Sequence, residues 1–392
     1  MAHELEDFLQ RENQNLKDAG LFKFELPVES PQKPVVTAND RELVNLASAN
    51  YLGLSNHPNL KRAAKVAIDE FGVGVAAPRM LSGTQTAHGR LEKHLAGFLE
   101  QDDAMVFGSG YHANTGLFES LFSDRDYVFL DSLAHPSLAD GVRLAKCRAL
   151  SYRSGDLDDL EDRLKRSRGA RFRIVVTDGV YPLDGDIAPL NEICGLALRY
   201  DALVVLHDPH GIGVLGDNGR GCAERHRALE RVTVITGSFN YALGGGGGGF
   251  VAGSQDLVSW LRQKSRPYLV SSALPPVGVA TASEAIKLVD REPQLRQRLS
   301  ANTETLKGEL EAAGLEVLGG GHPILCVLVG HAVNAQKITN ALYDNGIYAI
   351  GYCHPVVPDG EARVRLQVSA KHTKSALKRV AEVMGGAWSE RG

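Results

Sequence analysis

Three histidines follow apolar, strand-like runs of the sequence, where a parallel sheet would present side chains for chemistry. His135 lies in DSLAHPS after the run YVFL, and His207 and His210 lie in LHDPHGIG after ALVV. An imidazole exchanges protons near neutral pH because its ordinary pKa is about 6.5. These three residues are therefore candidates for general acid–base catalysis, with His135 or His207 as the base and His210 as an orienting group or oxyanion donor. Two histidines on one turn could also hold a metal, but no further ligand is placed beside them, so we predict none.

Tyr241 is the fourth candidate, in the stretch ITGSFNYALGGGGGGF. It follows a strand-like run and precedes six glycines, Gly244–Gly249, which let a backbone approach a ligand closely. A phenol with an ordinary pKa near 10 suits hydrogen-bond donation better than proton abstraction. Tyr241 is expected to donate a hydrogen bond or simply to fill space.

An anion seat is predicted where FGSGY (107–111) opens a helix. Ser109, Gly110 and Tyr111 come directly after the run AMVF, and unpaired backbone N–H groups at a helix start favour negative charge.

The elements that must position these residues alternate between strands and helices. Strands are expected at 104–107, 127–130, 172–176 and 202–206, with helices between them. Within 44–54 we expect a further strand that leads into an Asn/Gly turn. Apolar strands separated by helices predict an α/β fold with a mostly parallel sheet covered on both faces. Because ligands collect at the carboxyl ends of such strands, one site is expected there.

We expect three parts: an N-terminal helical arm (1–45), a large α/β domain (46–278) and a small C-terminal α+β domain (279–392). The net charge of −4 offers no basic surface for nucleic acid. Neither a signal peptide nor a membrane-spanning run is evident, and the five cysteines lack the spacing of a zinc site, so a cytoplasmic protein is expected.

Several longer segments resemble a known family. They are ANYLGLSNHP (49–58), SGTQTAHGRLEKHLAGF (82–98), FGSGYHANTG (107–116), AHPSLADGVRLA (134–145), TDGVYPLDGDIAPL (177–190), HGIGVLGDNGRG (210–221), WLRQKSRPYL (260–269) and RVRLQVSAKHT (363–373). Over nearly its full length the chain resembles the α-oxoamine synthases, such as 8-amino-7-oxononanoate synthase and 2-amino-3-ketobutyrate CoA ligase. These are fold-type I transferases that use pyridoxal phosphate (PLP) to condense an amino acid with an acyl-CoA. The resemblance implies that fold and a homodimer.

The resemblance also implies roles for single residues. His135 matches the residue stacked on the pyridine ring, and His210 one near its phenolic oxygen. The other matches, which we expect to bind the substrate, are the phosphate-side Ser109, Gly110, Tyr111 and Ser238, the carboxylate-binding Arg365, the entrance residue Asn50, and Asp208, an acid beside the pyridine partner.

Four positions depart from the family pattern. Tyr241 stands where the family has the lysine that binds PLP as an imine, and His207 stands where it has the acid that pairs with the pyridine nitrogen. Pro182 and Ala134 replace a serine and an asparagine of the family. Because a phenol cannot form an imine, we expect a chain that uses no cofactor.

The expected function is therefore a PLP-independent acyltransferase. It would move an acyl group from acyl-CoA or an acyl carrier protein to a small amine or hydroxyl acceptor, with a histidine as base. One alternative is decarboxylative condensation of an amino acid with acyl-CoA using PLP held non-covalently, and another is a non-catalytic metabolite-binding homologue.

Overall fold

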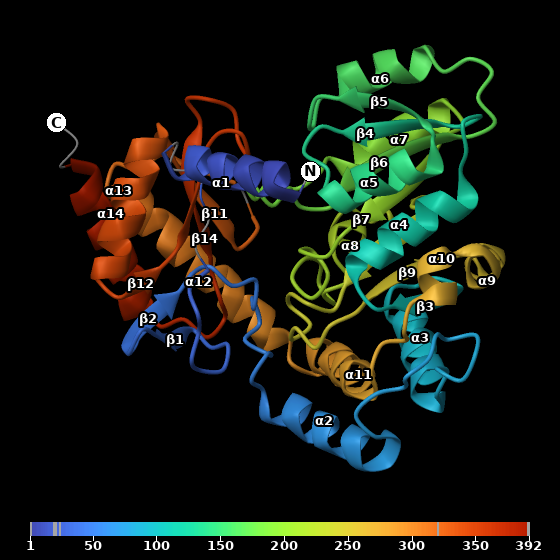
Figure 1. Ribbon diagram of the computed structural model, residues 1–392, viewed down its shortest axis with the longest axis horizontal. Coiled ribbons are helices and arrows are strands. Elements are labelled where there is room, and N and C mark those ends of the chain that lie inside the picture. Colours follow the sequence, from blue (N-terminus) through green and yellow to red (C-terminus); the bar gives the residue numbers. More distant parts are fainter. Residues whose placement is uncertain (1, 19–21, 23–24, 320, 390–392) are drawn as a thin grey trace.

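A seven-stranded sheet forms the centre of the large domain in the computed structural model, which describes residues 2–18, 22, 25–319 and 321–389 (Figure 1). The remaining positions of the predicted arm and small domain lie outside the described residues. The strand order is β3-β9-β8-β7-β6-β4-β5. The strands are β3 (Asp103–Phe107), β4 (Tyr127–Asp131), β5 (Arg148–Tyr152), β6 (Arg173–Asp178), β7 (Leu203–His207), β8 (Val234–Ser238) and β9 (Gly249–Gly253). Only β9 runs antiparallel, to both β3 and β8, so the predicted mostly parallel sheet is confirmed.

Helices cover both faces of this sheet because its strands are apolar on both sides. In β6, Val175 packs into one hydrophobic cluster, and Ile174 and Val176 into another. The first cluster includes α3 (Thr86–Phe98), α6 (Leu157–Lys165), α7 (Leu190–Arg199) and α11 (Pro276–Arg291); the second includes α4 (Gly110–Leu121), α5 (Pro136–Ala145) and α9 (Gln255–Lys264). Because β3, β4, β6, β7 and β8 all run in the same direction, their carboxyl ends lie along one edge of the sheet.

The small domain contains a four-stranded sheet with the order β10-β11-β14-β13. Its elements are α12 (Pro293–Ala312), β10 (Val317–Leu318), β11 (Ile324–Gly330), α13 (Ala332–Asp344), β12 (Ile347–Tyr348), β13 (Ile350–Tyr352), β14 (Ala362–Gln367) and α14 (Lys374–Ser389). The remaining helices of the large domain are α2 (Pro58–Phe71), α8 (Cys222–Arg225), the short 3-10 helix η1 (Leu229–Arg231) and α10 (Arg266–Val270).

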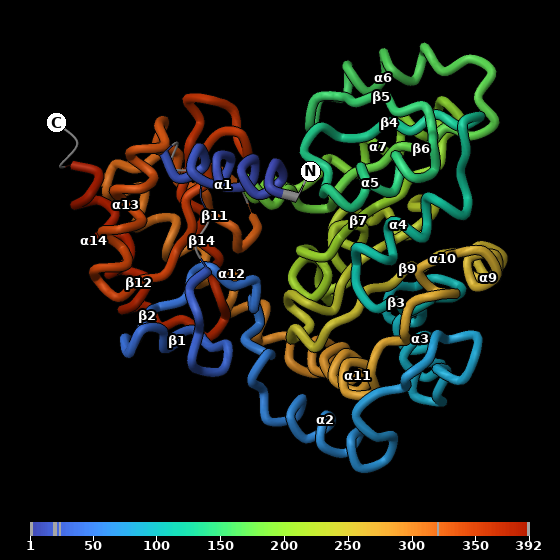
Figure 2. Tube along the Cα trace, in the orientation of Figure 1, coloured from blue at the N-terminus to red at the C-terminus, as the bar shows by residue number. Residues whose placement is uncertain are grey.

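The N-terminal arm differs from the helical segment predicted for it. Helix α1 (Ala2–Asp18) is followed by a hairpin of β1 (Val35–Ala38) and β2 (Arg41–Asn45), and β2 pairs in parallel with β12 (Figure 2). The strand expected at 44–54 ends at Asn45, after which a loop leads to α2. Residues of the N-terminal arm and of the small domain thus share one three-stranded sheet.

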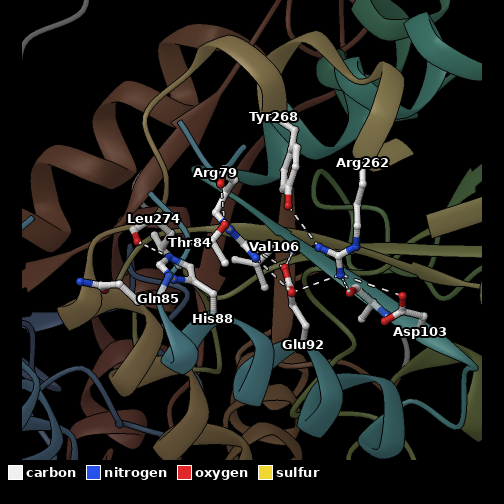
Figure 3. A network of polar contacts seen from close by, with 11 residues as sticks. Arg79, Thr84, Gln85, His88, Glu92, Asp103, Val106, Arg262, Tyr268 and Leu274 are labelled. Carbon is white, nitrogen blue, oxygen red and sulfur yellow. Dashed lines mark hydrogen bonds and ion pairs between the residues drawn. The ribbon is translucent and has the colours of Figure 1, made fainter. Parts of the chain in front are cut away.

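A buried ion-pair network holds the loop before α3 against the sheet edge (Figure 3). Arg79 donates two hydrogen bonds to Glu92, at 2.8 and 3.2 Å, and Arg262 donates a third at 3.1 Å. The backbone N–H of Val106 in β3 also donates to Glu92. Burial alone would raise the pKa of Glu92, but the hydrogen bonds and charge of Arg79 and the charge of Arg262 hold that pKa below its usual value.

No helix in the described ranges is long and apolar enough to cross a membrane.

Candidate functional site

The predicted anion seat is built by close backbone packing around the start of α4. Ser109 caps the helix, its Oγ accepting from the N–H of His112 at 3.1 Å. A Cβ at Gly249 of β9 would lie 2.3 Å from the backbone N of Gly110. Glycine is therefore required at position 249, and this explains the last residue of the glycine run. The sheet therefore packs directly against the start of α4, where the first backbone N–H groups of a helix have no partner within the helix.

Ser238 and Tyr111 flank this seat in different ways. The Ser238 hydroxyl donates to the carbonyl of Gly248 and accepts from the N–H of Asn240, each at 3.2 Å, so it shapes the turn after β8. The Tyr111 hydroxyl donates to Asp140 on α5 at 2.8 Å, and its ring is 47% exposed. The start of α4 therefore presents backbone groups to a ligand, rather than the Tyr111 phenol.

His135 caps the start of α5, and its neighbours determine its tautomer. Its Nδ1 accepts from the N–H of Ser137 at 3.2 Å and lies 2.7 Å from the Ser137 Oγ. A nitrogen that accepts from a backbone N–H carries no proton, so the proton of the neutral ring is on Nε2. Burial lowers the pKa of His135, which favours this neutral form. Its backbone N–H donates to Asp178, which ties the cap to the end of β6.

His207 is buried at the end of β7, 5.5 Å from His135 between ring centroids. Its Nδ1 lies 2.8 Å from the Thr236 Oγ1 on β8 and 3.4 Å from the Asn114 side-chain nitrogen. Burial, and then the nearby His135, lower the pKa of His207 to about 3. His207 is therefore a neutral imidazole at physiological pH and cannot supply the negative charge of a carboxylate.

Asp208 was expected to bind a ligand, but the structure uses its carboxylate within the protein. Its oxygens accept from the backbone N–H groups of Gly211 at 3.0 Å and Cys222 at 2.6 Å. Added Cβ atoms at Gly179, Gly211 or Gly221 would lie within 2.3 Å of this carboxylate. Burial raises the pKa of Asp208 to about 7. The residue holds the loop that carries the histidines.

His210 and Tyr241 form a stacked pair, with ring centroids 4.4 Å apart and planes 12° from parallel. The Nδ1 of His210 lies 2.8 Å from the hydroxyl of the fully buried Tyr51. Burial is the main cause that lowers the pKa of His210 well below 6.5, and burial raises the pKa of Tyr241. Both groups are neutral near pH 7, so Tyr241 can donate a proton in a hydrogen bond but is a poor base.

Arg365 on β14 supplies the positive charge of the site. It donates to the carbonyl of Pro182 at 3.1 Å and lies over the ring of Tyr352 at 4.7 Å. Within the described ranges it forms no ion pair with a carboxylate. Its charge lowers the pKa of both Tyr241 and His210, which places the guanidinium within electrostatic range of the stacked pair. Arg365 is therefore available for an anionic substrate group.

Asn50 supports the loop before α2, since its Oδ1 accepts from the N–H of Ser55 at 3.2 Å. Its neighbour Tyr51 was missed by the sequence analysis, as were Gln367 and His322. Tyr51 donates to Gln367, and His322 lies 3.1 Å from the carbonyl oxygen of His210. No spacing in the sequence connects these residues, although Tyr51 and Gln367 each lie inside a segment that carries the family resemblance.

Comparison with known proteins places this site in context. Residues 41–384 match the family model described as aminotransferase class I and II. The chain is 44% identical to 2-amino-3-ketobutyrate coenzyme A ligase of Escherichia coli (strain K12), with 96% of each chain covered. It is 40% identical to 8-amino-7-oxononanoate synthase of Bacillus pumilus, again covering 96% of each. A structure of serine palmitoyltransferase from S. paucimobilis, a lysine-to-alanine variant with bound PLP–myriocin aldimine, superposes with a TM-score of 0.92 at 31% identity, covering 98% of this chain and 97% of the other.

These comparisons contradict the expectation that the chain uses no cofactor. Proteins that match almost the whole chain belong to a family of PLP enzymes, and the superposed serine palmitoyltransferase holds PLP although a lysine is replaced by alanine. The loss of an imine-forming lysine does not imply the loss of the cofactor, and the prediction of no cofactor was wrong. PLP-independence is not supported.

Proposed function

Because the chain belongs to the α-oxoamine synthases of the aminotransferase class I and II family, we propose that it condenses an amino acid with an acyl-CoA and uses PLP held without a covalent bond. The observation that supports this proposal most strongly concerns Arg365. It lacks a carboxylate partner among the described residues, yet it lies within electrostatic range of the His210–Tyr241 pair. A cation in this position suits the carboxylate of an amino acid.

The residues present fit PLP in its phosphate and ring regions. The start of α4, tightened by Gly249, offers backbone N–H groups to a phosphate. His135 would pack against the ring, in the position that the resemblance assigns to it. The Oδ1 of Asn114, buried near His207, has no hydrogen-bond partner among the described residues and is thus a polar atom left for a ligand to satisfy. Two groups of the family site are missing: Tyr241 replaces the imine anchor, and His207 replaces the acid that pairs with the ring nitrogen.

When bound, PLP supplies an electron-withdrawing ring that stabilises negative charge on the carbon beside the substrate's amino group. Arg365 would hold the substrate carboxylate and so orient that carbon. His207 would meet the ring nitrogen as a neutral hydrogen-bonding group, so the ring is expected to withdraw electrons less strongly than one paired with a carboxylate. Tyr241 would close one side of the site and donate a hydrogen bond.

The names of the relatives suggest the partners. Coenzyme A appears in the name of the 44% identical ligase, so we propose acyl-CoA as the donor, with acyl carrier protein as the other thioester to test. Since 2-amino-3-ketobutyrate is a glycine unit bearing an acetyl group, glycine and acetyl-CoA are the first pair to test. A homodimer is proposed on the family resemblance.

The experiment follows thiol release from acyl-CoA in the presence and absence of PLP and of each amino acid. The proposal expects release that requires both additions, PLP that dialysis removes, and no pyridoxyl adduct after borohydride reduction. Thiol release without PLP would contradict it, as would a lysine adduct. An Arg365→Met variant is the matched test of substrate binding, since it keeps an unbranched, flexible side chain and removes its charge.

A further inference from the structure

We propose that Tyr51 and Gln367 hold His210 in the tautomer protonated on Nδ1, which makes its Nε2 the proton acceptor for the substrate. This rests on the proposed function and goes beyond it, because it names the base and two positioning residues. In the proposed step the substrate's C–H bond breaks, its electron pair stays on the carbon, and the proton bonds to Nε2 of His210. The product imidazolium keeps its Nδ1–H bond to Tyr51.

The tautomer follows from the donors and acceptors of one buried chain. The side-chain nitrogen of Gln367 donates to the carbonyl of Ala47 at 2.8 Å, so its Oε1 is the acceptor. Tyr51 donates its only hydroxyl proton to this Oε1 at 3.1 Å. The Tyr51 oxygen, 2.8 Å from Nδ1 of His210, must then accept. His210 therefore carries its proton on Nδ1, and Nε2 of the neutral ring has a lone pair.

This lone pair is not consumed by the surrounding protein. His322 approaches the backbone rather than the ring of His210: its Nδ1 accepts from the N–H of Ile324, and its Nε2 donates to the His210 carbonyl at 3.1 Å. Within the described ranges Nε2 of His210 makes no hydrogen bond, and it is not among the fully buried polar atoms without a partner. The ring stacks directly on Tyr241, which occupies the position of the family's lysine. The ring that carries the acceptor thus lies directly beside that position, 4.4 Å from the Tyr241 ring between centroids.

The other two histidines are poorer candidates for this role. His135 accepts from the N–H of Ser137 through Nδ1, so its neutral ring presents Nε2–H, a donor. His207 is 3% exposed, and its Nδ1 is engaged by Thr236. We therefore assign the role of base to His210, in place of the expected His135 or His207.

Electrostatics couple this base to substrate binding. Burial lowers the pKa of His210 first, followed by the neighbouring His322, by Arg365, and by His207 and His135. This keeps Nε2 unprotonated at neutral pH but makes it a weak base. A substrate carboxylate on Arg365 would offset the positive charge of that residue and raise the basicity of His210 once substrate has bound.

The tautomer can be measured on the protein without cofactor or substrate. In protein labelled with nitrogen-15 on histidine, two-bond hydrogen–nitrogen spectra should show His210 with Nδ1 protonated and Nε2 unprotonated, the signal being assigned by its loss in His210→Gln. Tyr51→Phe should populate the other tautomer, and Tyr152→Phe, at an equally buried tyrosine of β5, should not. A spectrum with the proton on Nε2 would overturn the proposal.

The catalytic role is tested by exchange of the amino acid's α-hydrogen with deuterated water in the presence of PLP. His210→Gln should slow exchange by about 10²- to 10⁴-fold while bound PLP, followed by absorbance, is retained. Tyr51→Phe and Gln367→Met should slow it by about 2- to 10-fold, since each removes one hydrogen bond. Full exchange in His210→Gln would refute the base assignment and leave the proposed function intact. Absence of exchange in the unaltered protein would instead refute the proposed function, with the tautomer still measured independently.

Discussion

Acid should unfold this protein steeply, because its site is built from buried neutral histidines. The pKa of His207 is lowered to about 3 and that of His322 to about 4, both by burial, against about 6.5 in an unfolded chain. Below pH 6.5 each of these histidines therefore binds a proton in the unfolded state, whereas in the folded state it stays neutral until the pH reaches its lower folded pKa. The stabilising contribution is complete above pH 6.5 and is lost as the pH falls through 6.5 towards the folded values. At pH 5 each of the two histidines lowers the free energy of unfolding by about 2 kcal/mol relative to neutral pH, and together they lower it by about 4 kcal/mol. The total stability of a folded protein is typically about 5–15 kcal/mol, so this loss is large.

The assay is chemical denaturation of the protein and of His322→Gln at pH 7 and at pH 5. Glutamine can keep the donor to the His210 carbonyl while removing the titrating ring. The variant should lose about 2 kcal/mol less stability between the two pH values than the unaltered protein. Tyr152→Phe serves as the control, since burial raises the pKa of Tyr152 well above 10 and it does not titrate in this range. Equal losses in the unaltered protein and in His322→Gln would refute the reasoning.

Three further perturbations have defined outcomes. Tyr241→Lys should restore a covalent anchor, seen by mass spectrometry as a pyridoxyl adduct on residue 241 after borohydride reduction; reduction without an adduct would argue against the assigned position. Glu92→Gln should cost about 3–5 kcal/mol in denaturation, because it leaves the buried Arg79 without its counter-charge, whereas Glu309→Gln at an exposed pair should cost less than about 1 kcal/mol. Arg365→Met should weaken amino-acid binding by about 10- to 100-fold, from the loss of a charged hydrogen bond worth about 1.5–3 kcal/mol, measured as a raised KM with PLP binding unchanged.

The large domain was predictable because its strands are buried on both faces and therefore read as apolar runs. Two strands were missed for physical reasons. β5, with the sequence RALSY, lies at the sheet edge and is mostly exposed, so it lacks such a run. β9, with the sequence GFVAG, begins with a glycine that close packing against Gly110 demands, and glycine is a weak signal for a strand.

The site was predictable where it depends on strand ends and unpredictable where it depends on the small domain. His135 and His207 converge because parallel strands end on the same edge. Tyr51 and Gln367, by contrast, are 316 residues apart in the sequence and meet only because β14 is placed beside the loop before α2. Pairing at that separation leaves no periodic pattern in the sequence, so the residues that orient His210 emerge only from the fold.

The prediction of no cofactor failed because it did not distinguish the covalent anchor of PLP from the rest of its binding site. An imine to lysine slows the departure of PLP, whereas the start of α4, the His135 ring and the buried polar atoms near His207 would hold its phosphate and ring whether or not that bond exists. Replacing the lysine by Tyr241 removes the tether and, with it, the group that could accept the substrate's proton. A buried imidazole already stacked on residue 241 can take over only the second of these losses. It follows that turnover should depend on the concentration of free PLP even though proton transfer remains possible within the site.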